Sequence, residues 1–401
     1  MQYRIVPKNG DRLSALGFGA MRLVTKDGRI DEERATRQVR GAIDNGINYI
    51  DTAFTYHRGE SERFLGRALR DGYREKVKLA TKLPCSVETR EDMDKILDLQ
   101  LKKLQTDHID YYLLHELVAS SWKRLYDLGV LEFLDAAKAS GKIRNVGFSF
   151  HGDRKTFMEI IDAYDWIFCQ IQYNFLDNMI QAGAEGLRYA ASKNIAVMIM
   201  EPLRGGLLTG NLPSEVEEIY RQARPARSAA EWSLRWIWNH PEVTVVLSGM
   251  NDEEHIVENL NTCEDALPDS MTSDELALIE AVAKSYRKQK KVDCTGCAYC
   301  MPCPHGVDIP HCFSLYNDFH QGGFRNRVIA RGKYGFWLVA GRGGTPADAS
   351  LCHRCGSCEK ECPQQIPIIM ELNKVHRGLG GLPTRLMIPL IRWMFSSKGK
   401  I

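Results

Sequence analysis

The sequence lacks any uninterrupted apolar run of about 18 residues, which a membrane-spanning helix requires. Its first residues lack the basic and then apolar stretch of a secretory leader. The net charge is only +2 at pH 7, and no internal repeat is evident beyond a regular alternation of strand-like and helix-like segments. We therefore expect a cytoplasmic protein without a membrane partner.

Disulfide bonds are also not expected, because the cytosol keeps thiols reduced, yet the chain has 12 cysteines. Eight of them form two closely spaced runs, each followed by proline: Cys294, Cys297, Cys300 and Cys303, then Cys352, Cys355, Cys358 and Cys362. The second run has the spacing C-x2-C-x2-C-x3-C-P of bacterial iron–sulfur proteins. Two [4Fe-4S] clusters are predicted, with zinc knuckles or redox-inert thiols as the alternatives.

The other four cysteines, Cys85, Cys169, Cys263 and Cys312, have no partner at such a spacing and are expected to be buried apolar side chains.

Charge is distributed unevenly along the chain. Residues 286–401 carry 17 Lys and Arg against 7 Asp and Glu, whereas residues 1–285 carry 36 against 44. A basic segment often binds nucleic acid. Because a cluster held by four thiolates is itself an anion, basic side chains can stabilise it without an external polyanion. We therefore expect no nucleic-acid partner.

Short apolar runs alternate with amphipathic segments eight times before residue 285. This repetition predicts an α/β fold, a (β/α)8 TIM barrel, with its active site at the C-terminal ends of the strands. A small, mainly helical iron–sulfur domain is expected to follow. The predicted boundaries are 1–285 for the barrel, 286–380 for the ferredoxin-like domain and 381–401 for an apolar and basic tail.

Four polar residues follow predicted strands and are the candidate catalytic residues: Asp51, Tyr56, Lys82 and His115. Reduction of a carbonyl needs a proton donor at the oxygen, and tyrosine, with a pKa of about 10, is a poor one at neutral pH. Lys82 is expected to lower the pKa of Tyr56, with Asp51 holding the lysine and His115 orienting the substrate oxygen.

These residues, in this order, resemble the tetrad of the aldo-keto reductase family. The likeness extends over the segments GFGAMRL (17–23), IDTAFTYHRGESERFLGRAL (50–69), LATK (79–82), YYLLH (111–115), GFS (147–149), QIQYN (170–174), EPLRGGLLTG (201–210) and VENL (257–260). The resemblance implies a nicotinamide cofactor, NADP in the family, and a small carbonyl substrate.

The same resemblance implies a set of cofactor-binding residues: Gly19, Ala20, Ser149, Gln172, Leu203, Arg204, Gly205, Ser248, Gly249 and Asn259. Arg204 is expected at the pyrophosphate. Phe150 stands where the family has asparagine, and no Lys or Arg follows the eighth strand to bind a 2′-phosphate. Arg221, Arg224 and Arg227 are alternatives for that role, so NADH and NADPH both remain open.

The cysteine runs resemble two-cluster ferredoxins, in which the fourth cysteine of each run serves the other cluster. The resemblance implies that Cys294, Cys297, Cys300 and Cys362 hold one cluster. The other would be held by Cys352, Cys355, Cys358 and Cys303. The first run departs from the pattern by one residue before Cys303.

Three functions remain open. The first is a nicotinamide-dependent carbonyl reductase coupled to iron–sulfur electron transfer. The second is a flavin-dependent reductase fed by ferredoxin or another one-electron carrier, since a flavin can split an electron pair between one-electron steps and Phe150 could stack on FMN. The third is an electron-transfer module with structural clusters and an idle barrel. The oligomeric state is left open.

Two connecting segments also carry expectations. Residues 273–293 are predicted to form a helix with Ser273 as N-cap. The glycines in 324–350 predict a loop between the two cysteine runs.

Overall fold

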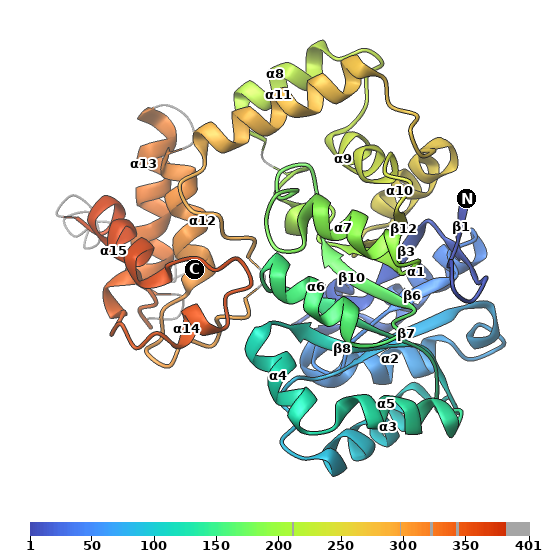
Figure 1. Ribbon diagram of the computed structural model, residues 1–401. Coiled ribbons are helices and arrows are strands. Elements are labelled where there is room, and N and C mark those ends of the chain that lie inside the picture. Colours follow the sequence, from blue (N-terminus) through green and yellow to red (C-terminus); the bar gives the residue numbers. More distant parts are fainter. Residues whose placement is uncertain (211, 297, 321–323, 342–344, 382–401) are drawn as a thin grey trace. The chain divides into compact units, whose positions relative to one another are not determined.

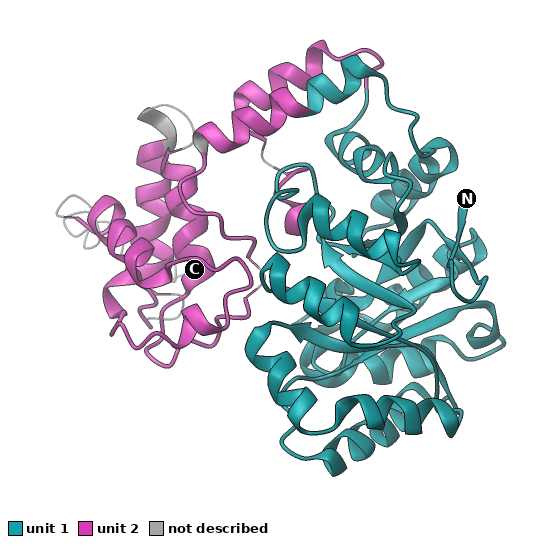
Figure 2. Ribbon diagram, in the orientation of Figure 1, with its two compact units in different colours: residues 1–203, 227–279 teal, residues 204–226, 280–401 magenta. Residues whose placement is uncertain are grey.

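The computed structural model describes residues 1–210, 212–296, 298–320, 324–341 and 345–381. The chain divides into two compact units, drawn in different colours in Figure 2. The first contains residues 1–203 and 227–279, and the second contains 204–226 and 280–401. A segment from the middle of the chain thus belongs to the same unit as the cysteine runs.

The first unit is a closed barrel of eight parallel strands, as predicted (Figure 1). The strands are β3 (Leu16–Gly19), β6 (Tyr49–Asp51), β7 (Lys78–Leu83), β8 (Ile109–Leu117), β9 (Ile143–Phe150), β10 (Phe168–Gln172), β11 (Ala196–Met200) and β12 (Val243–Ser248). Each pairs with the next, and β12 closes on β3, with Leu247 opposite Gly17. Almost every strand residue is buried, because a parallel barrel is covered on both faces.

The interior of the barrel is filled by side chains, as expected for a barrel of eight strands. The packed cluster consists of Val6, Leu13, Tyr49, Ala80, Tyr111, Leu113, Phe168, Ala196, Met198, Val245 and Leu247. Leu13 comes from an antiparallel hairpin of β1 (Tyr3–Ile5) and β2 (Arg12–Ser14) that precedes the barrel. The sequence pattern did not predict this hairpin.

Helices surround the strands in Figure 1. They are α1 (Glu32–Asp44), α2 (Glu60–Ala68), α3 (Arg90–Leu104), α4 (Ala119–Asp127), α5 (Val130–Ala139), α6 (Arg154–Ala163), α7 (Gly183–Ser192), α9 (Ala229–Trp238) and α10 (Glu253–Asp265). Side chains of Asp31 and Thr89 accept hydrogen bonds from the first turns of α1 and α3. Such caps satisfy backbone N–H groups that a helix leaves unpaired.

Short elements complete the first unit. They are a small antiparallel pair, β4 (Thr25–Lys26) with β5 (Arg29–Ile30), and the 3-10 turns η1 (Ala20–Arg22), η2 (Tyr56–Gly59) and η3 (Arg74–Lys76). η1 directly follows β3, η2 begins five residues after the end of β6, and both carry residues of the candidate site.

The second unit is helical, as predicted for the cysteine-rich part. Its elements are η4 (Arg204–Gly206), α8 (Ser214–Gln222), most of α11 (Ser273–Gln289), α12 (Ile309–His320), α13 (Phe324–Lys333), the π-helix η5 (Tyr334–Val339), η7 (Ala349–Leu351), α14 (Ser357–Lys360) and α15 (Ile368–Leu379). α8 lies beside α11, where the Ser285 hydroxyl donates to the Glu215 carboxylate at 2.9 Å.

Two local expectations are corrected here. The N-cap of α11 is Thr272, which exchanges hydrogen bonds with Glu275, so the predicted cap Ser273 is already helical. The segment expected to be a loop is helical from Phe324 to Val339. Tertiary packing outweighs the glycines here, because Tyr334 and Leu338 are buried in the core of this unit.

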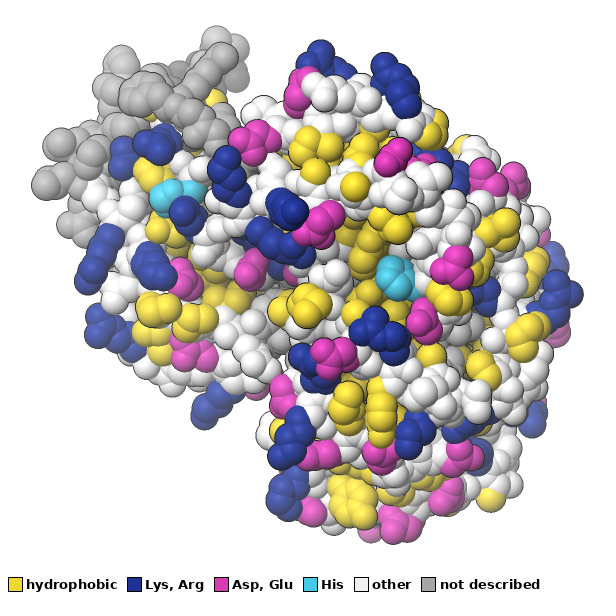
Figure 3. All heavy atoms as spheres, turned by 45° about the horizontal axis from the view of Figure 1, so that its top comes forward, with side chains coloured by type: hydrophobic (Ala, Val, Ile, Leu, Met, Phe, Trp, Pro, Cys, Tyr) yellow, Lys and Arg dark blue, Asp and Glu magenta, His cyan; other side chains and the backbone are white. Residues whose placement is uncertain are grey.

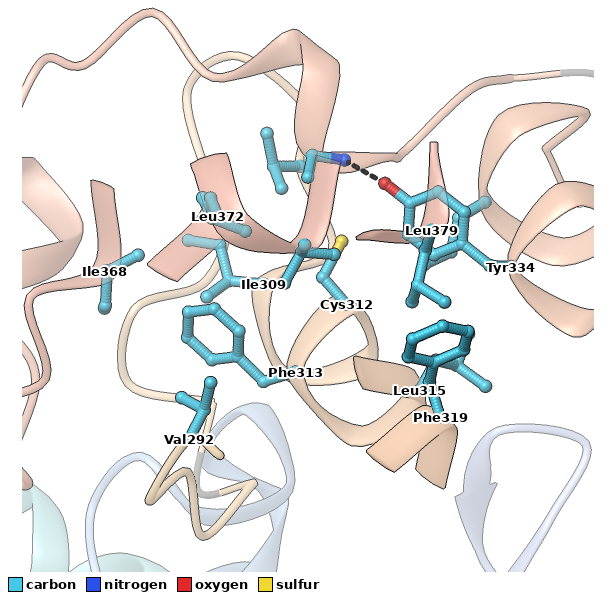
Figure 4. Packing of buried hydrophobic residues seen from close by; sticks show 14 of the residues in the cluster. Val292, Ile309, Cys312, Phe313, Leu315, Phe319, Tyr334, Ile368, Leu372 and Leu379 are labelled. Atoms are coloured by element: carbon cyan, nitrogen blue, oxygen red, sulfur yellow. Dashed lines mark hydrogen bonds between the residues drawn. The ribbon is translucent and has the colours of Figure 1, made fainter. Parts of the chain in front are cut away.

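That core is shown in Figure 4. It joins α12, η5 and α15 through Phe313, Tyr334 and Leu372, and the backbone N–H of Ala349 donates to the Tyr334 hydroxyl at 3.0 Å. Cys294, Cys300, Cys303, Cys352, Cys358 and Cys362 pack against its edge. A packed core of its own therefore holds the loops that carry the cysteines.

Among the helices of the described ranges, none is both long and apolar enough to span a membrane. On the face drawn in Figure 3, Lys and Arg side chains are interspersed with Asp and Glu. The predicted tail, except residue 381, lies outside the described residues.

Candidate active site and cluster-binding cysteines

A buried ion pair lies at the ends of two neighbouring strands, β6 and β7. The Lys82 ammonium donates to both carboxylate oxygens of Asp51, at 2.7 and 2.8 Å, and to the carbonyl of Thr52 at 2.7 Å. The Lys82 side chain is 0% exposed. Burial lowers the pKa of Lys82 and raises that of Asp51, while their mutual attraction opposes both shifts. Three short hydrogen bonds to the ammonium indicate an ionised pair.

Tyr56 starts η2, five residues beyond Asp51, and its hydroxyl lies 3.4 Å from the Lys82 ammonium. The expectation that Lys82 lowers the pKa of Tyr56 is not met. Burial, with the negative charges of Asp51, Glu116 and Glu201, raises the pKa of Tyr56 well above its usual value. The phenol is therefore in its protonated, proton-donating form at neutral pH.

His115 lies in β8 with its ring 5.9 Å from that of Tyr56, edge to face. Burial, then the charge of Lys82 and the neighbouring His151, lower the pKa of His115 well below its usual value. The imidazole is thus neutral at neutral pH, and its Nε2 lies 3.2 Å from a carboxylate oxygen of Glu116. The structure brings all four predicted catalytic residues together.

Two predicted cofactor-binding side chains, Ser149 and Gln172, lie buried near strand ends and form hydrogen bonds with neighbouring residues. The Ser149 hydroxyl accepts from the backbone N–H of Glu116 at 2.8 Å. Gln172 donates to Asp177 at 2.9 Å and accepts from Gln181 at 2.7 Å. Such bonds fix the orientation that each side chain presents.

The end of β3 and the end of β12 meet at another part of the predicted cofactor site. Asn259, in α10, donates to the Ser248 hydroxyl at 3.0 Å. A Cβ added at Gly19 would lie 3.5 Å from the carbonyl of Ser248, and one at Gly249 would lie 3.2 Å from Arg22. Ala20, which opens η1, is buried.

Phe150 is only 1% exposed. Its ring lies 5.1 Å from that of Phe157 and 6.4 Å from that of Phe148, edge to face in both pairs. The Phe150 ring is therefore packed between β9 and α6, and this packing argues against its stacking on a flavin.

The predicted pyrophosphate loop is divided between the two units, since Leu203 belongs to the first and Arg204 and Gly205 to the second. Arg204 is buried, and its guanidinium donates to the backbone carbonyl of Asp293 at 3.2 Å. Gly205 is exposed with φ +67°, a value that favours glycine. The structure thus gives Arg204 a partner that the sequence did not indicate.

The three alternative arginines are also engaged. Arg221 pairs with Glu218, Arg224 donates to the carbonyl of Ala223 at 2.8 Å, and Arg227 pairs with Glu275. These are contacts typical of a surface helix and its flanks.

The cysteines of the second unit separate into two groups that mix the two runs. Cys294, Cys300 and Cys362 line one small pocket. Burial, together with the nearby Cys362, raises the pKa of Cys294. Cys297 lies outside the described residues.

In the other group, burial raises the pKa of Cys358 to about 11, and Glu359, Cys352 and Cys303 add to the shift. Cys303 of the first run therefore lies near Cys358 of the second. Cys355 is exposed, and hydrogen bonds from Ser357 lower its pKa. This distribution of thiols fits two four-thiolate clusters that exchange their fourth ligands.

Within the described ranges, no three His, Cys, Asp or Glu side chains are grouped closely enough to hold a single metal ion. A cubane takes one thiolate at each of four irons, so its ligand sulfurs lie farther apart than those around one ion. Of the other cysteines, Cys169, Cys263 and Cys312 are buried as predicted, whereas Cys85 is half-buried and its thiol donates to the carbonyl of His115 at 2.5 Å.

The profile of the Aldo/keto reductase family matches residues 15–282, about two thirds of the chain. The chain belongs to this family. A second profile, described as a 4Fe-4S dicluster domain, matches residues 293–366 and implies two clusters in this aldo/keto reductase. Both resemblances found in the sequence are thereby confirmed.

Individual relatives are distant. The aldo-keto reductase YhdN of Bacillus subtilis is 30% identical over 54% of this chain and 66% of its own length. The L-galactose dehydrogenase of Arabidopsis thaliana is 27% identical over 70% of this chain and 94% of its own. The solved holo form of the aldo-keto reductase AKR11C1 from Bacillus halodurans has a TM-score of 0.61 and 26% identity, covering 71% of this chain and 97% of its own.

Sequence reasoning missed two acidic residues of this aldo/keto reductase, Glu116 and Glu201. Glu116 follows His115 and Glu201 follows β11, and each has a positive φ, +53° and +52°. Their charges act on Tyr56. Their position at strand ends could have identified them as candidate site residues from the sequence. Their left-handed backbone could not have been predicted, because glycine and asparagine are the residues that usually indicate this conformation.

Proposed function

We propose that this aldo/keto reductase reduces an aldehyde or ketone with a nicotinamide cofactor, using Tyr56 as the proton donor. The observation that carries the proposal is the position of the Tyr56 hydroxyl, 3.4 Å from an ammonium that is itself fixed by Asp51. The family to which the chain belongs supports the same chemistry.

The nicotinamide, when bound, supplies the hydride that reaches the carbonyl carbon. The Tyr56 phenol gives its proton to the carbonyl oxygen, so the product is an alcohol and the phenol is left as phenolate. The Lys82 ammonium then stabilises that negative charge at close range. A pKa raised by burial keeps Tyr56 protonated before the reaction, and water reprotonates it afterwards.

The neutral His115 imidazole lies beside Tyr56 and can donate an N–H to the same carbonyl oxygen. Its pKa, lowered by burial, prevents it from competing as a cation with Lys82. In this assignment Ser149 and Gln172 hold the nicotinamide carboxamide, and Gly19, Ala20, Ser248, Gly249 and Asn259 border the nucleotide.

We further propose that the eight cysteines hold two [4Fe-4S] clusters that exchange single electrons with a small redox carrier of the ferredoxin type. The clusters would supply one-electron steps, and the exposed Cys355 supports contact of the second cluster with such a partner. The distribution of Cys362 and Cys303 over the opposite runs supports the exchange of ligands.

Anaerobic purification followed by iron, sulfide and flavin analysis tests the cofactors. About eight irons without flavin are expected from two four-iron clusters. Bound FMN would favour the flavin-dependent alternative, and zinc in place of iron would overturn the cluster assignment.

Oxidation of NADH or NADPH with a panel of aldehydes and ketones tests the activity, comparing the native protein with Tyr56→Phe. The substitution is expected to lower kcat by about 10² to 10⁴ and to leave nucleotide binding unchanged. Tyr189→Phe is the matched control, because Tyr189 bonds Asp162 on the surface. Native protein that turns over no carbonyl would favour the electron-transfer module with an idle barrel.

A further inference from the structure

Two buried basic side chains contact the residue that precedes the first cysteine of the first run. The side chains of Arg204 and Lys290 are 0% and 5% exposed. Both reach Asp293, the residue before Cys294. The Lys290 ammonium lies 3.0 Å and the Arg204 guanidinium 3.6 Å from the same Asp293 carboxylate oxygen. The guanidinium also donates to the Asp293 carbonyl.

This arrangement joins two distant parts of the chain, since Arg204 and Asp293 are 89 residues apart. Burying a charged side chain carries a large desolvation cost, and proteins rarely bury one without specific partners. The Asp293 side chain itself is 74% exposed, so the two buried cations share one carboxylate that reaches the protein surface.

Asp293 directly precedes Cys294, so the two cations lie close to this predicted cluster ligand. The backbone N–H of Gly296 donates to the Cys294 sulfur at 3.4 Å. Positive charge and hydrogen bonds at a ligand sulfur stabilise the more negative, reduced state of an iron–sulfur cluster.

The second group of cysteines has different surroundings. Arg354 and Glu359, one charge of each sign, stand directly before Cys355 and directly after Cys358 in the chain. Cys355 is exposed to water. The buried pair of cations is thus a feature of the first group.

We propose that Arg204 and Lys290 raise the reduction potential of the cluster held by Cys294, Cys300 and Cys362. Arg204 is then a positioning residue of the electron-transfer unit and not the pyrophosphate ligand that its place in the PLRGGLLTG segment implies. The inference relies on the cluster-binding part of the proposed function.

An EPR-monitored redox titration of the anaerobically purified holoprotein tests the inference. In Arg204→Gln and in Lys290→Gln, the reduction equilibrium of the first cluster is expected to fall about tenfold, which is 59 mV for a one-electron couple. The second cluster serves as an internal reference and keeps its potential. Arg204→Lys retains the charge and is expected to shift less.

Two further variants distinguish an electrostatic effect on the potential from a loss of folding. Asp293→Asn removes the negative charge and is expected to shift the first potential upward, opposite in sign to the loss of either cation. Lys288→Gln is the control, because Lys288 lies two residues before Lys290 but is 76% exposed, and it is expected to leave both potentials unchanged. Iron content is measured for every variant, which identifies any variant that loses its clusters. If Arg204→Gln loses iron, the potentials of Asp293→Asn and Lys290→Gln test the inference in its place.

NADH and NADPH dissociation constants, measured by fluorescence, distinguish the two roles of Arg204. Unchanged constants with a lowered potential support the inference. An unchanged potential with weaker nucleotide binding would overturn it and restore the pyrophosphate assignment. The titration needs no carbonyl substrate, so an inactive barrel leaves it valid, whereas native protein without iron would refute the cluster assignment itself.

Discussion

Lys82 and Asp51 form an ion pair inside a closed barrel, with the ammonium 2.7 Å from one carboxylate oxygen and 2.8 Å from the other. Neither side chain is more than 4% exposed. A pair buried this deeply adds little net stability, because the desolvation cost of the two charges offsets much of their attraction. Its role is to hold the Lys82 ammonium at hydrogen-bonding distance from the Tyr56 hydroxyl.

Lys82→Met should destabilise the fold by about 3 to 5 kcal/mol, because it leaves the Asp51 carboxylate buried without its cation. The free energy of unfolding of the barrel, measured in urea, checks this value. The double variant Asp51→Asn, Lys82→Met should lose clearly less than the single one. Equal losses would contradict the ion pair. Lys95→Met, on an exposed helix face, is the control and should change stability by less than about 1 kcal/mol.

Glu116→Gln should move the alkaline limit of carbonyl reduction to lower pH. The negative charge of Glu116 helps to raise the pKa of Tyr56, and reduction needs the protonated phenol, so removing the charge lowers the pH at which activity falls. The measurement is kcat/KM against pH, with Glu159→Gln on the surface of α6 as control. A profile identical to that of the native protein would show that Glu116 does not act on Tyr56.

Stability should decrease as the pH falls from about 6.5 to 4. Burial lowers the pKa of His151 to about 4. Between this value and its ordinary pKa of 6.5, the unfolded chain binds a proton that the folded chain does not. Stability therefore rises with pH in this window, by about 3 kcal/mol in total for this residue.

Urea unfolding at several pH values between 4 and 7 measures this slope. His151→Gln cannot take up the proton and should make the slope shallower, whereas His108→Gln, a partly exposed histidine, should not. The buried His115 adds a slope of the same sign, so a slope in His151→Gln as steep as that of the native protein would assign the effect to other groups.

Cys362→Ser and Cys303→Ser should each remove one cluster. Cys362→Ser should remove the cluster whose other ligands are in the first run, and Cys303→Ser the cluster whose other ligands are in the second run. Iron content should fall by about half in both, from two four-iron clusters to one. EPR should show that different clusters remain. Cys312→Ala is the matched control, since Cys312 is a buried core cysteine, and it should retain all the iron. Loss of the same signal in both variants would contradict the exchange of ligands.

Much of the fold could be predicted from the sequence because the signals are local. Eight buried strands, each followed by helical periodicity, predict a barrel, and its polar strand ends predicted the meeting of Asp51, Tyr56, Lys82 and His115. Cysteine spacing predicted the dicluster domain for the same reason, since ligands of one cluster are supplied by a short loop.

Local signals failed where packing decides. The glycines of 324–350 predicted a loop, but burial of Tyr334 and Leu338 in a core formed with α12 and α15 makes the first part helical. Phe150 suggested a ring available for stacking, but it packs against Phe148 and Phe157. The pKa of Tyr56 was predicted from the one charge of Lys82, whereas burial and three carboxylates determine its direction.

The sequence by itself determined the family, the closed barrel, the order of the tetrad and the 4Fe-4S dicluster domain, because these depend on residue type, periodicity and short spacing. Only the tertiary structure decided the partner of Arg204, which is Asp293 rather than anything within its own loop. It also decided the charges around Tyr56. Electrostatic effects depend on distance and burial in three dimensions, and residues 89 positions apart carry no local pattern that would reveal such a contact.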